Sequence, residues 1–117
     1  MRGFFKFGSP FLRLKVEGKE IEALLDTGFN GHLMLPQTII DELALDQIGI
    51  SDYITANGVK TMTKVYRGKV QLLGGEVEIP ILSTEAMMIL AGFGLFKDCT
   101  IIIDQKKGRL EVGKSGE

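Results

Sequence analysis

Residues 23–31 read Ala-Leu-Leu-Asp-Thr-Gly-Phe-Asn-Gly (ALLDTGFNG), so an apolar run ends on one carboxylate and is followed by glycine-rich residues. The apolar part is typical of a buried strand, and the glycines are typical of a loop. The aspartate, Asp26, has two explanations. It can accept backbone N–H bonds within the turn, as aspartate often does, or it can serve as a catalytic carboxylate. The pattern of residue types leaves both explanations open.

The length and charge of the chain restrict its class. With 117 residues we expect one domain, residues 1–117, whose last residues, 113–117, form a flexible polar tail. The net charge of -1 provides no long-range positive field to attract nucleic acid or an anionic membrane. Arg2 and Lys6 interrupt the apolar N-terminal residues, which predicts neither a signal peptide nor a membrane span. We therefore expect a cytoplasmic protein with no nucleic-acid or membrane partner.

Several other kinds of site are disfavoured by the composition. Cys99 and His32 are each the only residue of their type, so one chain offers neither a disulfide nor a Cys/His zinc set, and we expect no metal and no cofactor. His32 is interpreted as a surface or rim residue and Cys99 as a small buried one. Residues 92–94, Gly-Phe-Gly, resemble the start of a dinucleotide loop, but Lys97 stands where the third glycine would be.

The chain is predicted to consist mainly of strands. Alternating residues at 12–16, a turn and an apolar segment at 21–25 indicate a hairpin, and Asn57-Gly58 predicts a second, projecting hairpin over residues 52–66. Pro80 suggests a sheet edge. Further strands are expected at 66–73, 76–81, 100–104 and 109–112, a buried run at 87–90, a short helix after Pro36, and a helical piece at 95–97.

The catalytic explanation of Asp26 requires a second carboxylate. One carboxylate cannot be both general acid and general base toward the same peptide bond, whereas a symmetric dimer brings the same residue from two chains to one axis. Two such carboxyls share a proton, because both cannot easily ionise at short range. Thr27 offers a hydroxyl that can bond across the axis, and Gly28 allows a close backbone approach.

Three features together resemble the retropepsin-like aspartic proteases, and their prokaryotic single-domain branch in particular. They are the apolar-apolar-Asp-Thr-Gly sequence at 24–28, the Asn-Gly hairpin, and the second apolar-Gly segment at 90–92. The resemblance implies an all-β, mainly closed-barrel fold with one or two short helices. It also implies a homodimer that hydrolyses an extended peptide or protein substrate through an activated water.

The resemblance also implies roles for individual residues. Asp26 matches the catalytic residue, and Thr27, Gly28 and Phe29 match the active-site loop. The resemblance also assigns a substrate-binding flap tip to Ala56, Asn57 and Gly58, and a second glycine segment to Gly92 and Gly94.

An alternative function keeps the same fold. Phe29 and Gly94 stand where the resembling proteins usually carry a small and a polar residue respectively. The chain can therefore also be interpreted as a catalytically silent peptide-binding or dimerisation module, which Asp26→Asn would distinguish from an aspartic endopeptidase.

Overall fold

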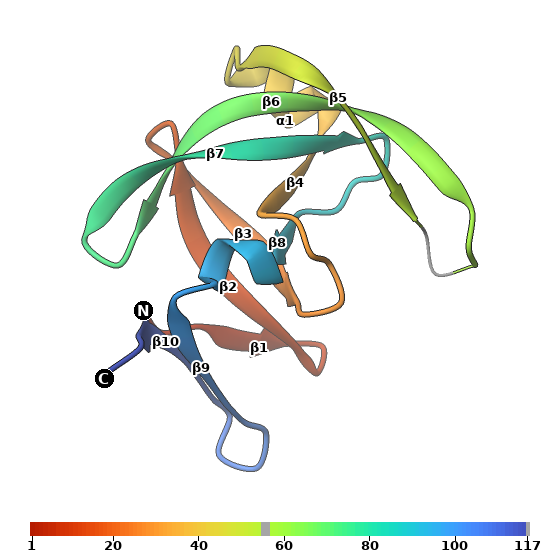
Figure 1. Ribbon diagram of the computed structural model, residues 1–117. Coiled ribbons are helices and arrows are strands. Elements are labelled where there is room, and N and C mark those ends of the chain that lie inside the picture. Colours follow the sequence, from red (N-terminus) through yellow and green to blue (C-terminus); the bar gives the residue numbers. More distant parts are fainter. Residues whose placement is uncertain (55–56, 117) are drawn as a thin grey trace.

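The computed structural model describes residues 1–54 and 57–116, and strands make up most of it (Figure 1). The strands are β1 (Phe4–Lys6), β2 (Ser9–Val16), β3 (Lys19–Asp26), β4 (Leu33–Pro36), β5 (Asp46–Ile54), β6 (Lys60–Leu72), β7 (Gly75–Thr84), β8 (Leu90–Gly92), β9 (Cys99–Asp104) and β10 (Arg109–Lys114). A short helix, α1 (Gln37–Glu42), follows β4, and a single 3₁₀ turn, η1 (Phe93–Phe96), follows β8. The predicted all-β class is confirmed.

The main sheet closes on itself. Its strand order is β1-β2-β3-β8-β4-β7-β6-β5, and β2 also pairs with β6 through Lys15 with Gln71 and Val16 with Val70. This extra pairing joins the two ends of the β2-to-β6 series into a barrel. The barrel leaves β1 and most of β5 outside the ring, and β9 with β10 forms a separate two-stranded sheet.

The barrel interior follows from the alternation in the sequence. Along β2 every second side chain is buried, because successive side chains in a strand point to opposite faces. All four side chains of β4 are buried; β7 pairs with the whole strand and β8 with its first two residues. The fully buried side chains with the largest volumes are Leu12, Leu14, Val16, Leu33, Leu35, Ile40, Val70, Ile81, Leu110 and Val112.

Strand β8 lies between two strands that are consecutive in the chain. It runs parallel to β3, with Asp26 opposite Gly92, and antiparallel to β4, with Leu33 opposite Ala91. The loop that connects β3 to β4 therefore has to pass over the end of β8. This crossing brings the segment after Asp26 against the segment that begins at Gly92.

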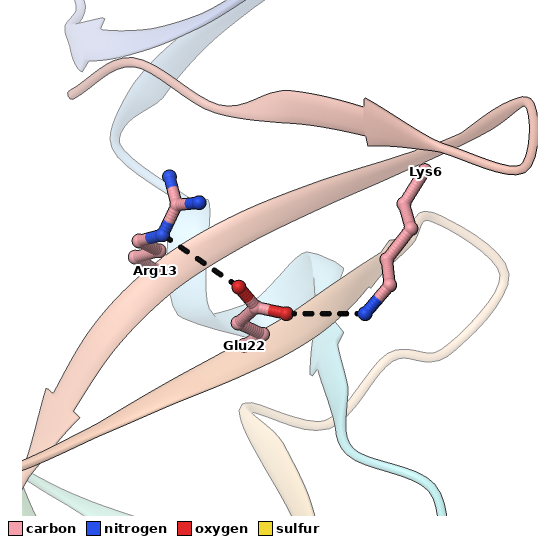
Figure 2. Close-up of polar contacts among 3 residues, drawn as sticks. All are labelled: Lys6, Arg13 and Glu22. Atoms are coloured by element: carbon pink, nitrogen blue, oxygen red, sulfur yellow. Dashed lines mark hydrogen bonds and ion pairs between the residues drawn. The ribbon is translucent and has the colours of Figure 1, made fainter.

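The outer face of β1, β2 and β3 carries aromatic and charged side chains. The rings of Phe4 and Phe11 stack with centroids 5.8 Å apart, and the guanidinium of Arg13 lies 4.1 Å from the Phe4 centroid. Glu22 lies between Lys6, at 3.3 Å, and Arg13, at 3.7 Å (Figure 2). Exposed ion pairs of this kind stabilise little, so the aromatic stacking makes the larger contribution to holding β1 on β2.

The start of the chain connects the small sheet to the barrel. The amino group of Met1 donates to the carbonyl of Val112 at 2.7 Å, and the amide of Gly3 donates to the carbonyl of Leu110 at 2.8 Å. Strand β10 is therefore hydrogen-bonded on both edges, whereas β9 is bonded to β10 alone. In the described residues no helix is both long enough and apolar enough to cross a membrane.

Several sequence predictions are confirmed in detail. The hairpin of β2 and β3, the helix after Pro36 and the strand-ending position of Asp26 all occur. Pro80 lies on the part of β7 that pairs with β6 alone, because the pairing of β7 with β4 begins at Ile81. A residue without an N–H fits such an edge.

Other boundaries were wrong. The projecting hairpin begins at Asp46 rather than at residue 52, because the polar residues there pair with β6. Met87 and Met88, expected in a buried run, are 81% and 43% exposed, since they lie in the irregular link to β8. The 3₁₀ turn starts two residues early, at Phe93, and β10 continues to Lys114, so two residues expected in the tail are paired with β9.

The position of Ile81 generates a prediction about stability. Ile81 is fully buried beside Leu33 and Tyr66, and its Cδ1 atom fills the space over Gly68. Ile81→Ala should lower the free energy of unfolding by about 2 to 5 kcal/mol. The matched control Ile50→Ala, at a side chain 66% exposed, should cost less than about 1 kcal/mol. Urea unfolding of both variants checks this, and equal losses would contradict it.

Candidate active site

Asp26 is held by the turn that it begins. It is the half-buried last residue of β3, and its Oδ1 accepts a hydrogen bond from the amide of Gly28 at 3.0 Å. Its carbonyl accepts a second bond, from the amide of Phe29 at 3.2 Å. Within the described residues Oδ2 accepts no hydrogen bond. Asp26 therefore does accept a backbone amide within its turn, as the first explanation requires, and its second carboxylate oxygen forms no bond to the described residues.

Three backbone hydrogen bonds join the loop after Asp26 to the segment after β8. The amide of Gly92 donates to the carbonyl of His32 at 2.9 Å, and the amide of Phe93 donates to that of Phe29 at 2.7 Å. The amide of Gly94 donates to the carbonyl of Gly31 at 3.1 Å. The site loop and the glycine segment, separated by about sixty positions in the sequence, therefore form one hydrogen-bonded unit.

This contact explains the glycines at 92 and 94. A Cβ atom on Gly92 would overlap the carbonyl oxygen of Gly31 and lie 2.8 Å from that of Phe29. A Cβ atom on Gly94 would lie 2.6 Å from the carbonyl oxygen of Asn30. Real Cβ atoms do not approach backbone oxygens so closely, so only glycine permits the three bonds. The polar residue expected at position 94 from the resemblance would push the two segments apart.

The ring of Phe29 packs back onto its own loop. Its ring atoms occupy the space where a side chain on Gly31 would lie, and Cδ2 lies 2.6 Å from the position of a Cβ atom on Gly92. Phe29 is half-buried as a result. Its bulk thus fills the junction of the two glycine-rich segments, while its outer side forms part of a cavity wall.

A cavity of about 550 Å³ lies between the site loop and the projecting hairpin. On one side it is lined by the loop from Gly28 to His32. On the other it is lined by β5, β6 and β7, through Ser51, Asp52, Val65, Pro80 and Leu82. Its volume is in the range of small-ligand and peptide side-chain pockets. The cavity therefore forms a cleft that begins two residues after Asp26 and extends under the base of the hairpin.

Solved structures with the same architecture were found in a comparison with known proteins. A retropepsin-like aspartic protease from Rickettsia conorii superposes with a TM-score of 0.69 and 17% identity, over 94% of this chain and 86% of that one. The EIAV protease superposes with a TM-score of 0.63 and 16% identity, over 77% of this chain and 86% of that one. The simian foamy virus protease superposes with a TM-score of 0.53 and 21% identity, over 70% of this chain and 86% of that one. The sequence matches no protein-family model and no curated protein.

The chain has the fold of the retropepsin-like aspartic proteases. Its Asp-Thr-Gly loop follows β3, its glycine segment follows β8, and the two are in contact, as the geometry above describes. Thr27, the second residue of the Asp-Thr-Gly sequence, is exposed, and its side chain forms no hydrogen bond with another described residue.

The hairpin of β5 and β6 is the one in which the flap was predicted, and we call it the flap hairpin, or flap. Gly58 has a φ of +83°, and the amide of Val59 donates to Oδ1 of Asn57 at 3.4 Å, as suits an Asn-Gly turn. Ala56, also predicted at the tip, lies outside the described residues. Ser51 and Thr63 are paired across the two strands on the face that includes Val65. That face lies toward the cleft, since Ser51 and Val65 both line it.

Sequence reasoning missed a polar network at the base of the flap. The Thr63 hydroxyl donates to the carbonyl of Ser83 at 2.5 Å, and the Ser83 hydroxyl donates to Oε1 of Gln37 at 2.5 Å. Nε2 of Gln37 donates in turn to the Tyr66 hydroxyl at 3.1 Å. The network joins α1, β6 and β7. The available signal was Ser83, a serine at the end of an apolar run, and it is nearly buried.

His32 and Cys99 lie near the glycine segment. His32 is half-buried, and burial together with the nearby Lys97 cation lowers the pKa of its imidazole. Cys99 is partly exposed rather than buried as predicted, and burial, with a smaller effect of Asp98, raises the pKa of its thiol. Among the described residues no three His, Cys, Asp or Glu side chains form a group suited to a metal ion.

A substitution of Gly92 tests the contact between the two segments. Gly92→Ala should lower the free energy of unfolding by more than about 2 kcal/mol, because the new Cβ meets a backbone oxygen that cannot move independently. Adding Phe29→Ala should not restore stability, since the carbonyl of Gly31 remains. Gly113→Ala in β10, where nothing lies within 4 Å, is the control and should have little effect. Urea unfolding measures all three, and rescue by Phe29→Ala would contradict the backbone explanation.

An ion pair on the flap generates a pH prediction. Nζ of Lys60 lies 2.8 Å from Oδ2 of Asp52, and this hydrogen bond and charge hold the pKa of the Asp52 carboxyl below its ordinary value. Because the pKa is lower in the folded hairpin, the stabilisation is present above the ordinary pKa of aspartate and is lost as the pH falls through the folded value.

Titration of the Asp52 carboxyl by NMR checks this prediction. In Lys60→Gln the pKa of Asp52 should rise to the ordinary range, whereas the control Lys69→Gln, on the same strand but away from Asp52, should leave it depressed. An unchanged pKa in Lys60→Gln would assign the shift to another cause.

Proposed function

We propose that this chain is an aspartic endopeptidase that acts as a homodimer, with one Asp26 from each chain forming the catalytic pair. The observation that carries the proposal is the placement of Asp26 in a retropepsin-like fold. The carboxylate ends a half-buried strand and is oriented by its own turn, and one of its oxygens bonds to none of the described residues.

The proposed reaction uses the pair as one acid and one base. The two carboxyls share a single proton, because two negative charges at short range repel. The ionised member takes a proton from a water, which attacks the carbonyl carbon of the scissile peptide bond. The protonated member donates its proton to the carbonyl oxygen and so stabilises the tetrahedral intermediate. The intermediate then breaks down: the departing amine takes up a proton from the protonated member, the carbon–nitrogen bond breaks, and one hydroxyl of the intermediate returns its proton to the ionised member, which restores the shared proton.

The flap supplies the second part of the proposal. Its cleft-facing side includes the hydroxyl-bearing Ser51 and the apolar Val65, a mixture that suits an extended peptide. A peptide lying between the flap and the site loop would form strand-like backbone bonds, and its side chains would enter the cleft of about 550 Å³. Closure of the Asn57-Gly58 tip would exclude water from the reacting bond.

Cleavage of a diverse peptide library from acidic to neutral pH tests the proposal. Asp26→Asn should reduce turnover by more than about a hundredfold, because the amide cannot act as a base but still accepts the bond from Gly28. Asp104→Asn is a matched control. Its Oδ1 also accepts a backbone amide in a turn, from Lys107 at 3.1 Å, and its turnover should be unchanged.

Mixing the two proteins tests the symmetric pair separately. If each active site needs one Asp26 from each chain, an equal amount of Asp26→Asn should reduce the activity of a fixed amount of wild type to about half, because half of the wild-type chains enter mixed dimers. Undiminished activity would mean that each chain acts alone. If wild type and Asp26→Asn bind the same peptides and neither cleaves them, the peptide-binding module replaces the peptidase.

A further inference from the structure

A second cavity, which shares only His32 with the cleft among the described lining residues, is larger, at about 710 Å³. Three segments line it: the turn between β6 and β7, the η1 turn with the residues that follow it, and the end of β10. Figure 1 shows the β6–β7 turn at the left of the molecule, above the C-terminal end of β10. The proposed peptidase reaction makes no use of this cavity.

One wall of the second cavity is apolar. Ile79 and Leu95 line it and are buried, and Leu72 and Leu73 line it and are partly exposed. Val77 is 41% exposed in the same wall. A concave apolar wall open to solvent is the usual lining of a small-molecule site, since an apolar group that covers it displaces water.

The lining of the cavity also carries positive charge. Lys97 and Lys114 both line it, and neither has an ion-pair partner among the described residues. His32 lines the same cavity. Asp98 is the only acidic residue in the described lining. The rim therefore has a small excess of positive charge beside an apolar wall.

We propose that this cavity binds an unbranched alkyl carboxylate, with the alkyl chain on the apolar wall and the carboxylate between Lys97 and Lys114. A neutral apolar ligand would leave the two lysines without a counterion. A small anion such as acetate would leave the apolar wall in water. An anion with two or more charges would be opposed by Asp98, so a single carboxylate matches the rim best.

The only cysteine of the chain provides a direct measurement of occupancy. Cys99 lines the cavity and is partly exposed, so a neutral reagent such as iodoacetamide can reach its thiol. A bound ligand should shield it. At four times its dissociation constant, sodium octanoate should slow alkylation about fivefold, because only the unoccupied protein reacts. Acetate and 1-octanol at the same concentration should leave the rate nearly unchanged.

Lysine variants locate the carboxylate. Lys97→Gln and Lys114→Gln should each weaken octanoate binding by about three- to fivefold, and the control Lys106→Gln, in the turn between β9 and β10, should not change it. Lengthening the chain should tighten binding by at most about fourfold per methylene group. For each variant, the alkylation rate with octanoate is compared with the rate of the same variant without octanoate, because replacing a lysine can also change the reactivity of the Cys99 thiol.

Three results would overturn the proposal. If 1-octanol protects Cys99 as well as octanoate does, charge has no role in binding. If acetate protects it equally, the apolar wall has no role. If both lysine variants bind octanoate as tightly as wild type, the carboxylate does not bind at these lysines. Asp26→Asn should bind octanoate as wild type does, since Asp26 does not line this cavity. The outcome therefore does not depend on whether the chain is a peptidase.

Discussion

The backbone contact between the site loop and the glycine segment is the constraint on which the site depends. Three amide-to-carbonyl bonds cross it, and they form only because positions 92 and 94 have no side chains. The same contact fixes β8 between β3 and β4, which are consecutive strands that could otherwise pair directly. The position of Asp26 thus follows from backbone packing, and the Phe29 ring fills the space that the glycines leave.

Strand β6 links this site to the flap because its two halves have different neighbours. From Val65 onward it pairs with β7, and near its end it also pairs with β2 and closes the barrel. Before Val65 it pairs with β5 alone. The network of Gln37, Thr63 and Ser83 lies at this change of neighbours. A hairpin without further strand partners beyond an anchored base has low local stability, which suits the proposed closure of the flap over a peptide.

The sequence was informative where one local signal decides the structure. Alternation predicted the buried face of β2, Asn57-Gly58 predicted the flap turn, and the apolar run predicted that a strand ends at Asp26. It was uninformative where partners distant in the chain decide. Met87 and Met88 look like a buried strand but have no covering element, and the network around Gln37 depends on three elements that only the fold brings together. Cavities are equally invisible, because each combines segments far apart in the chain.

The two explanations of Asp26 use different parts of the same carboxylate. Oδ1 accepts the amide of Gly28, which fixes the direction of the side chain, and Oδ2 bonds to no described residue. The turn thus holds the carboxylate in one direction, and preorganisation of this kind is what the proposed catalytic pair requires. An asparagine preserves the turn but cannot ionise. The turn is therefore the support for the proposed chemistry rather than its competitor, and the two roles separate only when the charge is removed.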